Sequence, residues 1–301
     1  MIDAGQTTKN DIASESAAAY LAGLTGNTGK VITLDFCIIT HAHTDHYIGL
    51  KYFNSYNINV EKMYVNAYYN NVKPDGKVSL STRLQAMKDK GLIKNIYSIE
   101  TGHPPIMISC GDATLKILPP IFPGSKTATE APEGEVNIRS MICTLDHSNY
   151  KYIFMGDVYE KDGQGLSTIR NTDLYKNCLV PGNNQTVIYK ISHHGRRNNK
   201  NYNKSEEQKM YDCISKHGKN TVYCIANRNY TKSNSTQTAY DKYATNSLNL
   251  QNLWYNNSPN VYFNTGYKKT GTSETAYYSV PIERYNGISA LTSITSLSLY
   301  Y

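Results

Sequence analysis

The apolar residues of this chain recur in short runs that are separated by polar stretches containing proline and glycine. The run at 31–39 is rich in β-branched side chains and ends in polar residues, which predicts a buried strand that delivers its last residues to a sheet edge. Other strands and short elements are expected at 62–65, 113–118, 138–145, 150–155, 174–179, 186–191, 221–226 and 261–266. Helices are expected at 11–24, 46–56, 79–91 and 205–217, with a loop at 121–135.

This alternation of strands and helices predicts an α/β sandwich, in which two sheets are covered by outer helices. The 301 residues, 40% of them hydrophobic, can bury such a core without splitting. We therefore expect a single domain over residues 1–285 and a C-terminal tail over residues 286–301. No apolar run approaches the length of about eighteen residues that a membrane-spanning helix needs.

The most informative segment follows the strand at 31–39 and reads Thr40-His41-Ala42-His43-Thr44-Asp45-His46, an H-x-H-x-D-H pattern. Residues two apart at a strand end share a face, so His41 and His43 can hold one metal ion together. Asp45 and His46 lie past the turn and can point at a second position. Imidazole nitrogens and carboxylate oxygens suit Zn²⁺ and related divalent ions, so the segment predicts a metal site.

Three further motifs accompany this segment. Ile2-Asp3-Ala4-Gly5 opens the chain, Met155-Gly156-Asp157 ends a strand-like run, and Ser192-His193-His194-Gly195 ends another. With these motifs the chain resembles the metallo-β-lactamase superfamily of two-metal hydrolases, closely over residues 1–195 and more loosely over 196–285. The resemblance implies an αββα sandwich of two mixed sheets. It also implies one or two β-hairpins that would precede Asp3.

The resemblance implies a role for each matching residue. Asp3 is expected to be structural, and Asp157 to bridge two divalent ions, Zn²⁺ or alternatively Mn²⁺, that share a hydroxide. The implied ligand set is His41, His43, Asp45, His46, Asp157 and His194. His193 then contacts the substrate phosphate or a leaving oxygen, because adjacent residues leaving a strand point to opposite sides. The candidate catalytic residues are Asp45, Asp157 and His193.

The third motif departs from the superfamily pattern, because many members carry a histidine where this chain has Asn137. The segment Asn137-Ile138-Arg139-Ser140 resembles one branch of the superfamily. That branch contains the nuclease-like domain of ComEC-type DNA-uptake proteins and the phosphorylcholine esterases of choline-binding surface proteins. The missing ligand is then either water or His103. The candidate substrate-binding residues are Asn137, His193 and Arg196.

Charge and cysteine content add two weaker indications. The net charge is +7, and the densest basic group brackets the paired histidines: Lys190, Arg196, Arg197, Lys200 and Lys204. This group is either a rim that attracts phosphate or an ordinary solvated loop. The six cysteines are scattered without C-x-x-C spacing, which favours buried thiols and a reducing compartment such as the cytoplasm. An extracellular location stays open if a leader has been removed.

Three functions therefore compete. The first is hydrolysis of a phosphodiester in a nucleic acid or a phosphorylated small molecule. The second is hydrolysis of a carbon ester, lactone or β-lactam, and the absence of the usual third-motif histidine counts against it. The third is a non-catalytic module that binds metal or ligand, and the complete H-x-H-x-D-H pattern with Asp157 counts against that. No sequence feature points to an obligate protein partner.

Overall fold

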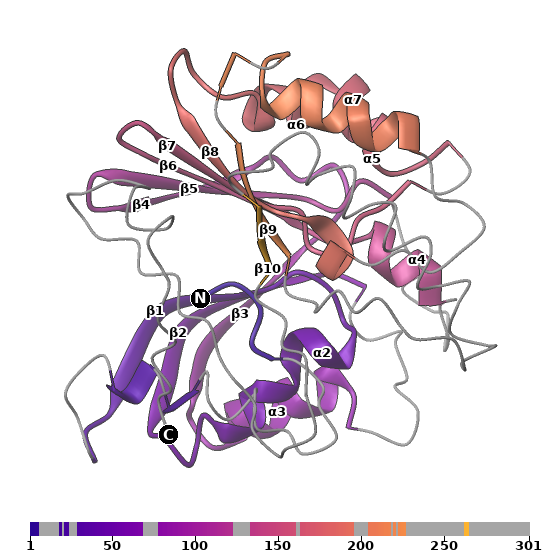
Figure 1. Ribbon diagram of the computed structural model, residues 1–301. Coiled ribbons are helices and arrows are strands. Elements are labelled where there is room, and N and C mark those ends of the chain that lie inside the picture. Colours follow the sequence, from indigo (N-terminus) through magenta and orange to yellow (C-terminus); the bar gives the residue numbers. More distant parts are fainter. Residues whose placement is uncertain are drawn as a thin grey trace, which may run out of the picture. The chain divides into compact units, whose positions relative to one another are not determined.

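The computed structural model describes residues 1–5, 18–19, 21–23, 29–68, 78–122, 133–160, 163–195, 204–217, 219–220, 222–226 and 262–264 (Figure 1). The chain divides into two compact units. The first comprises Met1–Ile106, Ile117–Ile142 and Gly156–Val158, and the second comprises Met107–Lys116, Cys143–Met155 and Tyr159–Tyr301. A single domain over 1–285 stays a prediction, and the expected tail at 286–301 lies outside the described residues.

A three-stranded parallel sheet forms the centre of the first unit. Its strands are β1 (Ile32–Ile39), β2 (Ile58–Asn66) and β3 (Ile93–Ile99), in the order β1-β2-β3. The helices of this unit are α2 (Thr44–Tyr47), the 3₁₀ helix η1 (Ile48–Tyr52), α3 (Leu80–Asp89) and α4 (Glu133–Ile138). Because the strands are parallel, their carboxyl ends lie at one edge of the sheet. The H-x-H-x-D-H segment begins at that edge.

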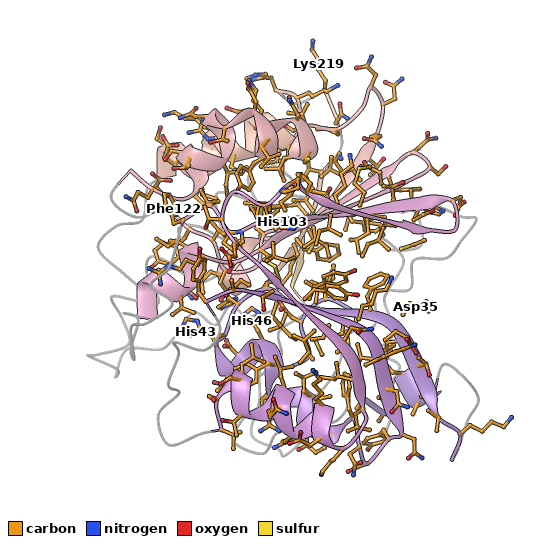
Figure 2. The ribbon with its side chains drawn as sticks, turned by 180° about the vertical axis from the view of Figure 1, so that it is seen from behind. Asp35, His43, His46, His103, Phe122 and Lys219 are labelled. Atoms are coloured by element: carbon orange, nitrogen blue, oxygen red, sulfur yellow. The ribbon has the colours of Figure 1, made fainter. Side chains whose placement is uncertain are left out.

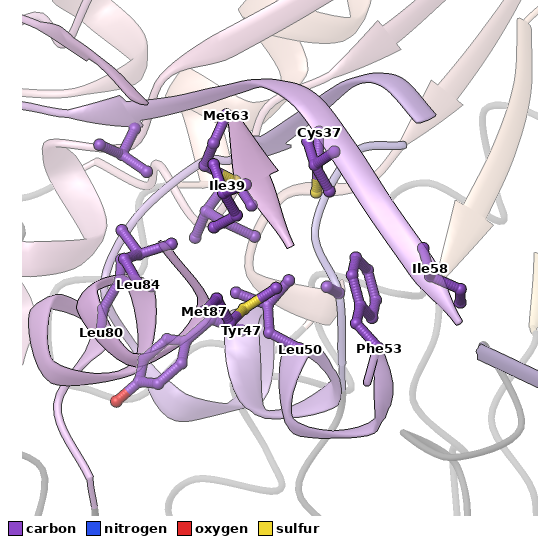
Figure 3. Packing of buried hydrophobic residues seen from close by; sticks show 14 of the residues in the cluster. Cys37, Ile39, Tyr47, Leu50, Phe53, Ile58, Met63, Leu80, Leu84 and Met87 are labelled. Atoms are coloured by element: carbon purple, nitrogen blue, oxygen red, sulfur yellow. The ribbon is translucent and has the colours of Figure 1, made fainter. Parts of the chain in front are cut away.

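Apolar side chains from β1 and β2 pack against η1 and α3 to form the core of the first unit (Figure 3). Leu80, Leu84 and Met87 recur at helical spacing, which gives α3 one buried face. Ser79 caps this helix, because its hydroxyl accepts a hydrogen bond of 3.2 Å from the Thr82 N–H. Burial of each large apolar side chain contributes about 1.5–3 kcal/mol. This packing holds the segment after β1 against the sheet edge.

The second unit contains most of a seven-stranded sheet, counted over the described residues, with the order β10-β9-β8-β7-β6-β5-β4. The strands are β4 (Ile106–Cys110), β5 (Ala113–Leu118), β6 (Ile142–His147), β7 (Tyr150–Phe154), β8 (Thr186–Lys190), β9 (Val222–Ala226) and β10 (Tyr262–Asn264). β6 and β7 form an antiparallel hairpin, and β7 to β10 pair in parallel. The helices are α5 (Leu166–Asn171), α6 (Asp173–Leu179), η3 (Ser192–Gly195, a 3₁₀ helix) and α7 (Lys204–Ile214).

The predicted α/β class is confirmed, since the chain forms two sheets with accompanying helices, as a metallo-β-lactamase-like sandwich requires. The described strands of the first sheet all pair in parallel, whereas the second sheet is mixed. The strands expected at 138–145 and 150–155 correspond to the hairpin of β6 and β7, whose turn consists of Ser148 and Asn149. Ser148 has a φ of 53°, the left-handed value that a two-residue hairpin turn requires.

Several predicted elements differ from the observed ones. The expected helix at 46–56 is a short α2 followed by a 3₁₀ helix, and Ile138 ends α4 where a strand was expected. Strands β3 and β4 and helix α5 were not anticipated. Of the expected helix at 11–24, residues 18–19 and 21–23 are helical and the remainder lies outside the described residues. None of the described helices combines the length and apolar character needed to cross a membrane.

Candidate metal centre

The histidines of the H-x-H-x-D-H segment gather where β1 ends. Thr40 and His41 follow the strand and are buried, with exposed fractions of 0% and 1%. His43 is the N-cap residue of α2, and Asp45 and His46 lie within that helix. Figure 2 shows His43 and His46 close to each other. His46 is also buried, at 2% exposure. The short helix therefore folds the second half of the motif back toward the first half.

Three predicted ligands come together as one group. The donor atoms of His41, His43 and Asp157 all lie within 4.8 Å of one another. His41 Nε2 lies 3.1 Å from His43 Nδ1 and 3.7 Å from Asp157 Oδ2. His46 Nε2 approaches the same Asp157 oxygen at 3.2 Å. The structure thus places three imidazoles around one buried carboxylate.

Asp157 reaches this position through a close contact between two chain segments. Its N–H donates a hydrogen bond of 3.0 Å to the Ser140 hydroxyl. The preceding Gly156 has a φ of 54°, and a Cβ built on it would lie 2.6 Å from the Ser140 Cβ. Met141 N–H donates to the Thr40 carbonyl at 2.9 Å, which ties the segment after α4 to the end of β1. Only a glycine at position 156 permits the close approach to Ser140, because glycine has no side chain.

The Asp3 carboxylate contacts Thr40 and His46 on the side of the histidines that faces away from Asp157. Its Oδ1 accepts a hydrogen bond of 2.8 Å from the Thr40 N–H, and its Oδ2 lies 3.0 Å from Thr40 Oγ1. The same Oδ2 lies 2.8 Å from His46 Nδ1. Asp3 has a φ of 54°, a conformation that aspartate tolerates better than most residues. Its carboxylate therefore joins the N-terminal segment to both halves of the motif.

The pKa values of the two buried histidines move in opposite directions. Burial, reinforced by the positive field of His46, lowers the pKa of His41 well below its ordinary value. Burial also disfavours charge on His46, but the carboxylates of Asp157 and Asp3 outweigh it and raise the pKa of His46 well above its ordinary value. Burial thus favours a neutral His41, whereas the two carboxylates favour positive charge on His46.

The donor set fits a divalent metal ion. Zn²⁺ binds histidine nitrogen at about 2.0–2.1 Å with tetrahedral geometry, which places neighbouring ligand atoms roughly 3.3 Å apart. The separations of 3.1 and 3.7 Å from His41 Nε2 bracket that value. His41 and His46 each have an outer partner on Nδ1, the Thr40 hydroxyl and the Asp3 carboxylate, as metal-binding histidines usually do. His41, His43 and Asp157 therefore form a candidate metal-binding group.

The remaining predicted site residues lie apart from this group or outside the described side chains. His103 is exposed, and its Nδ1 lies 2.6 Å from the Pro104 carbonyl. Asn137 is buried near the end of α4, with 3% exposure, and among the described residues its Oδ1 has no hydrogen-bond partner. The His194 side chain and Arg196 lie outside the described part of the structure.

The sequence predicts that His193 directly continues a strand, but the structure shows otherwise. β8 ends at Lys190, and His193 lies in the 3₁₀ helix η3 with a φ of 50°. The expectation that strand alternation separates the two histidines is therefore wrong, although their roles stay predictions. The His193 ring stacks on Tyr159, with ring centroids 5.5 Å apart and an angle of 18° between the ring planes. This stacking orients the imidazole within the second unit.

Sequence reasoning missed three supporting residues. Thr40 and Ser140 provide the hydroxyl groups that contact Asp3 and Asp157. Asn66, at the end of β2, donates to the Thr40 carbonyl at 3.2 Å and accepts from the Tyr68 N–H at 3.0 Å. Each is a small polar residue next to a strand end, which is a common pattern in loops. Only their position beside a recognised motif could have singled them out.

Comparison with known proteins adds little to this picture. No protein-family profile matches the chain, and no curated protein sequence matches it. Among solved structures, the chain is similar to Zn²⁺-bound PqqB from Methylobacterium extorquens, with a TM-score of 0.28 and 9% identity. The match covers 51% of this chain and 44% of PqqB, so it spans less than half the length of that protein. A likeness at this level carries no argument, and the case for a metal site rests on the residues themselves.

Proposed function

We propose that this chain is a metal-dependent hydrolase that cleaves phosphodiesters with a hydroxide shared by two divalent ions. The observation that carries the proposal is the convergence of His41, His43 and Asp157 donor atoms within 4.8 Å, with His46 on the same carboxylate. Buried histidines around a buried aspartate are costly to maintain unless they bind something. A pair of divalent ions lowers the pKa of the water between them and supplies a nucleophile near neutral pH.

The number of donors supports two ions. One tetrahedral ion uses four ligands, and the motif residues together offer more than that. In this proposal His41 and His43 would hold the first ion, Asp45, His46 and His194 would hold the second, and Asp157 would be a ligand of both. Zn²⁺ is the proposed metal, with Mn²⁺ as the alternative, because nitrogen and oxygen donors suit both.

Three features support a phosphodiester substrate over a carbon ester or lactam. Asn137 occupies the place of the usual third-motif histidine, and its side-chain N–H groups can donate to a phosphate oxygen. His193 supplies an imidazole that can contact a phosphate oxygen. The basic residues around the paired histidines, Arg196 among them, favour a substrate with negative charge. A nucleic acid and a phosphorylated small molecule both meet these requirements.

The test combines metal content with a comparison of substrates. Protein purified in zinc-supplemented buffer is measured by elemental analysis, and hydrolysis of bis-p-nitrophenyl phosphate, p-nitrophenylphosphorylcholine and nitrocefin is compared. We expect more than one metal ion per chain and the fastest turnover with a phosphodiester. Faster turnover of nitrocefin would support the carbon-ester and lactam class instead. Metal binding without turnover of any substrate would indicate a non-catalytic module.

A further inference from the structure

The Asp3 carboxylate accepts hydrogen bonds from both sides of the metal motif. One oxygen accepts from the Thr40 N–H at 2.8 Å. The other oxygen lies 3.0 Å from the Thr40 hydroxyl and 2.8 Å from His46 Nδ1. An ionised carboxylate can only accept, so the Thr40 hydroxyl and His46 Nδ1 must each direct a proton toward Asp3.

The direction of the Thr40 hydroxyl determines the protonation of His41. A hydroxyl has a single proton, and that proton is directed at Asp3. Thr40 Oγ1 also lies 3.1 Å from His41 Nδ1, where it must therefore accept a hydrogen bond. His41 Nδ1 then carries the ring proton. When the ring is neutral, Nε2 has its lone pair exposed to the His43 and Asp157 side chains.

His46 has the same arrangement without the intermediate hydroxyl. Its Nδ1 donates directly to Asp3, and its Nε2 faces Asp157 Oδ2 at 3.2 Å. His41 Nε2 faces that same oxygen at 3.7 Å. At its distance of 3.2 Å, a proton on His46 Nε2 is donated to Asp157 Oδ2, and a bound metal ion takes the place of that proton. One carboxylate, Asp3, thus controls Nδ1 of His46 directly and Nδ1 of His41 through the Thr40 hydroxyl.

We propose that Asp3 and Thr40 are positioning residues that hold a proton on Nδ1 of His41 and of His46, so that both Nε2 atoms face the cation site at Asp157. Asp3 acts on His46 directly and on His41 through the Thr40 hydroxyl. The cation itself rests on the proposed function, whereas the position of the His41 proton does not. Which nitrogen of a histidine binds a metal is set by the hydrogen bond that the other nitrogen makes.

The first measurement uses metal-free protein labelled with ¹⁵N at histidine. Two-bond ¹H–¹⁵N correlation spectra distinguish a ring protonated on Nδ1 from one protonated on Nε2, and the His41 signals are assigned by their loss in His41→Gln. We expect His41 to be protonated on Nδ1 in the natural protein and in Thr40→Ser, which keeps the hydroxyl. Thr40→Val removes the hydroxyl at nearly constant volume, so we expect its His41 proton to move to Nε2.

The second measurement is zinc affinity, determined by competition with a chromophoric chelator. We expect Thr40→Val to weaken binding by about 10- to 100-fold, as the loss of an outer hydrogen-bond partner typically does, and Thr40→Ser to restore it. Thr144→Val is the matched control. Thr144 is also fully buried, and its hydroxyl has no hydrogen-bond partner among the described residues. Its affinity for zinc should equal that of the natural protein.

The outcomes separate this inference from the proposed function. Nε2 protonation of His41 in the natural protein overturns the inference, and this result needs no variant to fold. Unchanged zinc affinity and an unchanged His41 proton in Thr40→Val overturn it as well. If the natural protein shows Nδ1 protonation but binds no zinc, the proposed function fails while the control of His41 by Thr40 stands.

Discussion

Gly156 lies directly against Ser140: a Cβ on Gly156 would be 2.6 Å from the Ser140 Cβ and 2.9 Å from its hydroxyl oxygen. The contact explains why a glycine precedes the aspartate of the Gly156-Asp157 pair. It lets the Ser140 hydroxyl accept the hydrogen bond of the Asp157 N–H. The position of the Asp157 carboxylate therefore depends on a residue that contributes no side chain.

The variant Gly156→Ala should be destabilised and should lose metal affinity. The new methyl group must displace Ser140, and alanine is strained at a φ of 54°. We expect a loss of about 1–3 kcal/mol in the free energy of unfolding from the overpacking. Urea denaturation measures it. Gly91→Ala is the control, because Gly91 also has a positive φ, of 70°, but has open space around it. Equal losses in the two variants would show that the contact with Ser140 is unimportant.

The variant Asp157→Asn tests the proposed bridge between two ions. An amide oxygen binds divalent ions more weakly than a carboxylate and cannot serve both equally. We expect phosphodiester hydrolysis to fall by at least about 100-fold while circular dichroism shows an intact fold. Asp112→Asn changes an aspartate whose side chain is 82% exposed and should leave hydrolysis unchanged. Near-normal turnover in Asp157→Asn would place the bridge elsewhere.

The paired histidines should respond differently to substitution. If His194 is a ligand of the second ion, His194→Ala should lose about one metal ion per chain. His193→Ala should retain both ions but bind inorganic phosphate less well, because a charge-assisted hydrogen bond is lost. Elemental analysis and phosphate inhibition measure the two effects. Loss of the ion in His193→Ala, with retention in His194→Ala, would reverse the assignment.

The ion pair between Arg170 of α5 and Glu206 of α7 should make the free energy of unfolding depend on pH. Burial would raise the pKa of Glu206, but hydrogen bonds from Lys209, at 2.7 Å, and from Arg170 lower it below its ordinary value of 4.5. A carboxylate with a lowered pKa stabilises the fold above its unfolded-state pKa, and this contribution is lost as the pH falls through the folded-state value.

We therefore expect Glu206→Gln to be less stable than the natural protein at pH 7, with the difference shrinking below about pH 4.5. Urea denaturation across this range measures it. Glu61→Gln breaks an exposed pair with Lys94 and should change stability little at either pH. A Glu206→Gln difference that is independent of pH would show that the charge of Glu206 has no part in it.

Sequence alone predicted the three members of the candidate metal-binding group, His41, His43 and Asp157. The prediction was possible because few side-chain types bind divalent metal ions. The supporting residues were not identified, because Thr40 and Ser140 act through backbone placement and a single hydroxyl. Their importance arises from contacts between segments far apart in the chain, which no local pattern records.

The missed and misplaced elements have similar physical causes. β3 has few buried apolar residues, and several of its side chains are exposed, among them Tyr97 at 43% exposure. Its sequence therefore lacks the alternation of apolar and polar residues that indicates a strand. Only pairing with β2 makes it a strand. The paired histidines follow an apolar strand, which suggested that they continue it. The chain instead turns into η3 after Lys190, and a positive φ at His193 does not follow from its residue type.

The discontinuity of the first unit bears on how the protein folds as it is synthesised. The H-x-H-x-D-H segment is synthesised before Gly156–Val158, which completes its unit. Stretches of the second unit, Met107–Lys116 and Cys143–Met155, emerge in between. Asp157 therefore reaches His41, His43 and His46 only after the whole intervening stretch of chain has been synthesised. Pairing at such sequence separation is slow, so capture of a metal ion would mark a late step in folding.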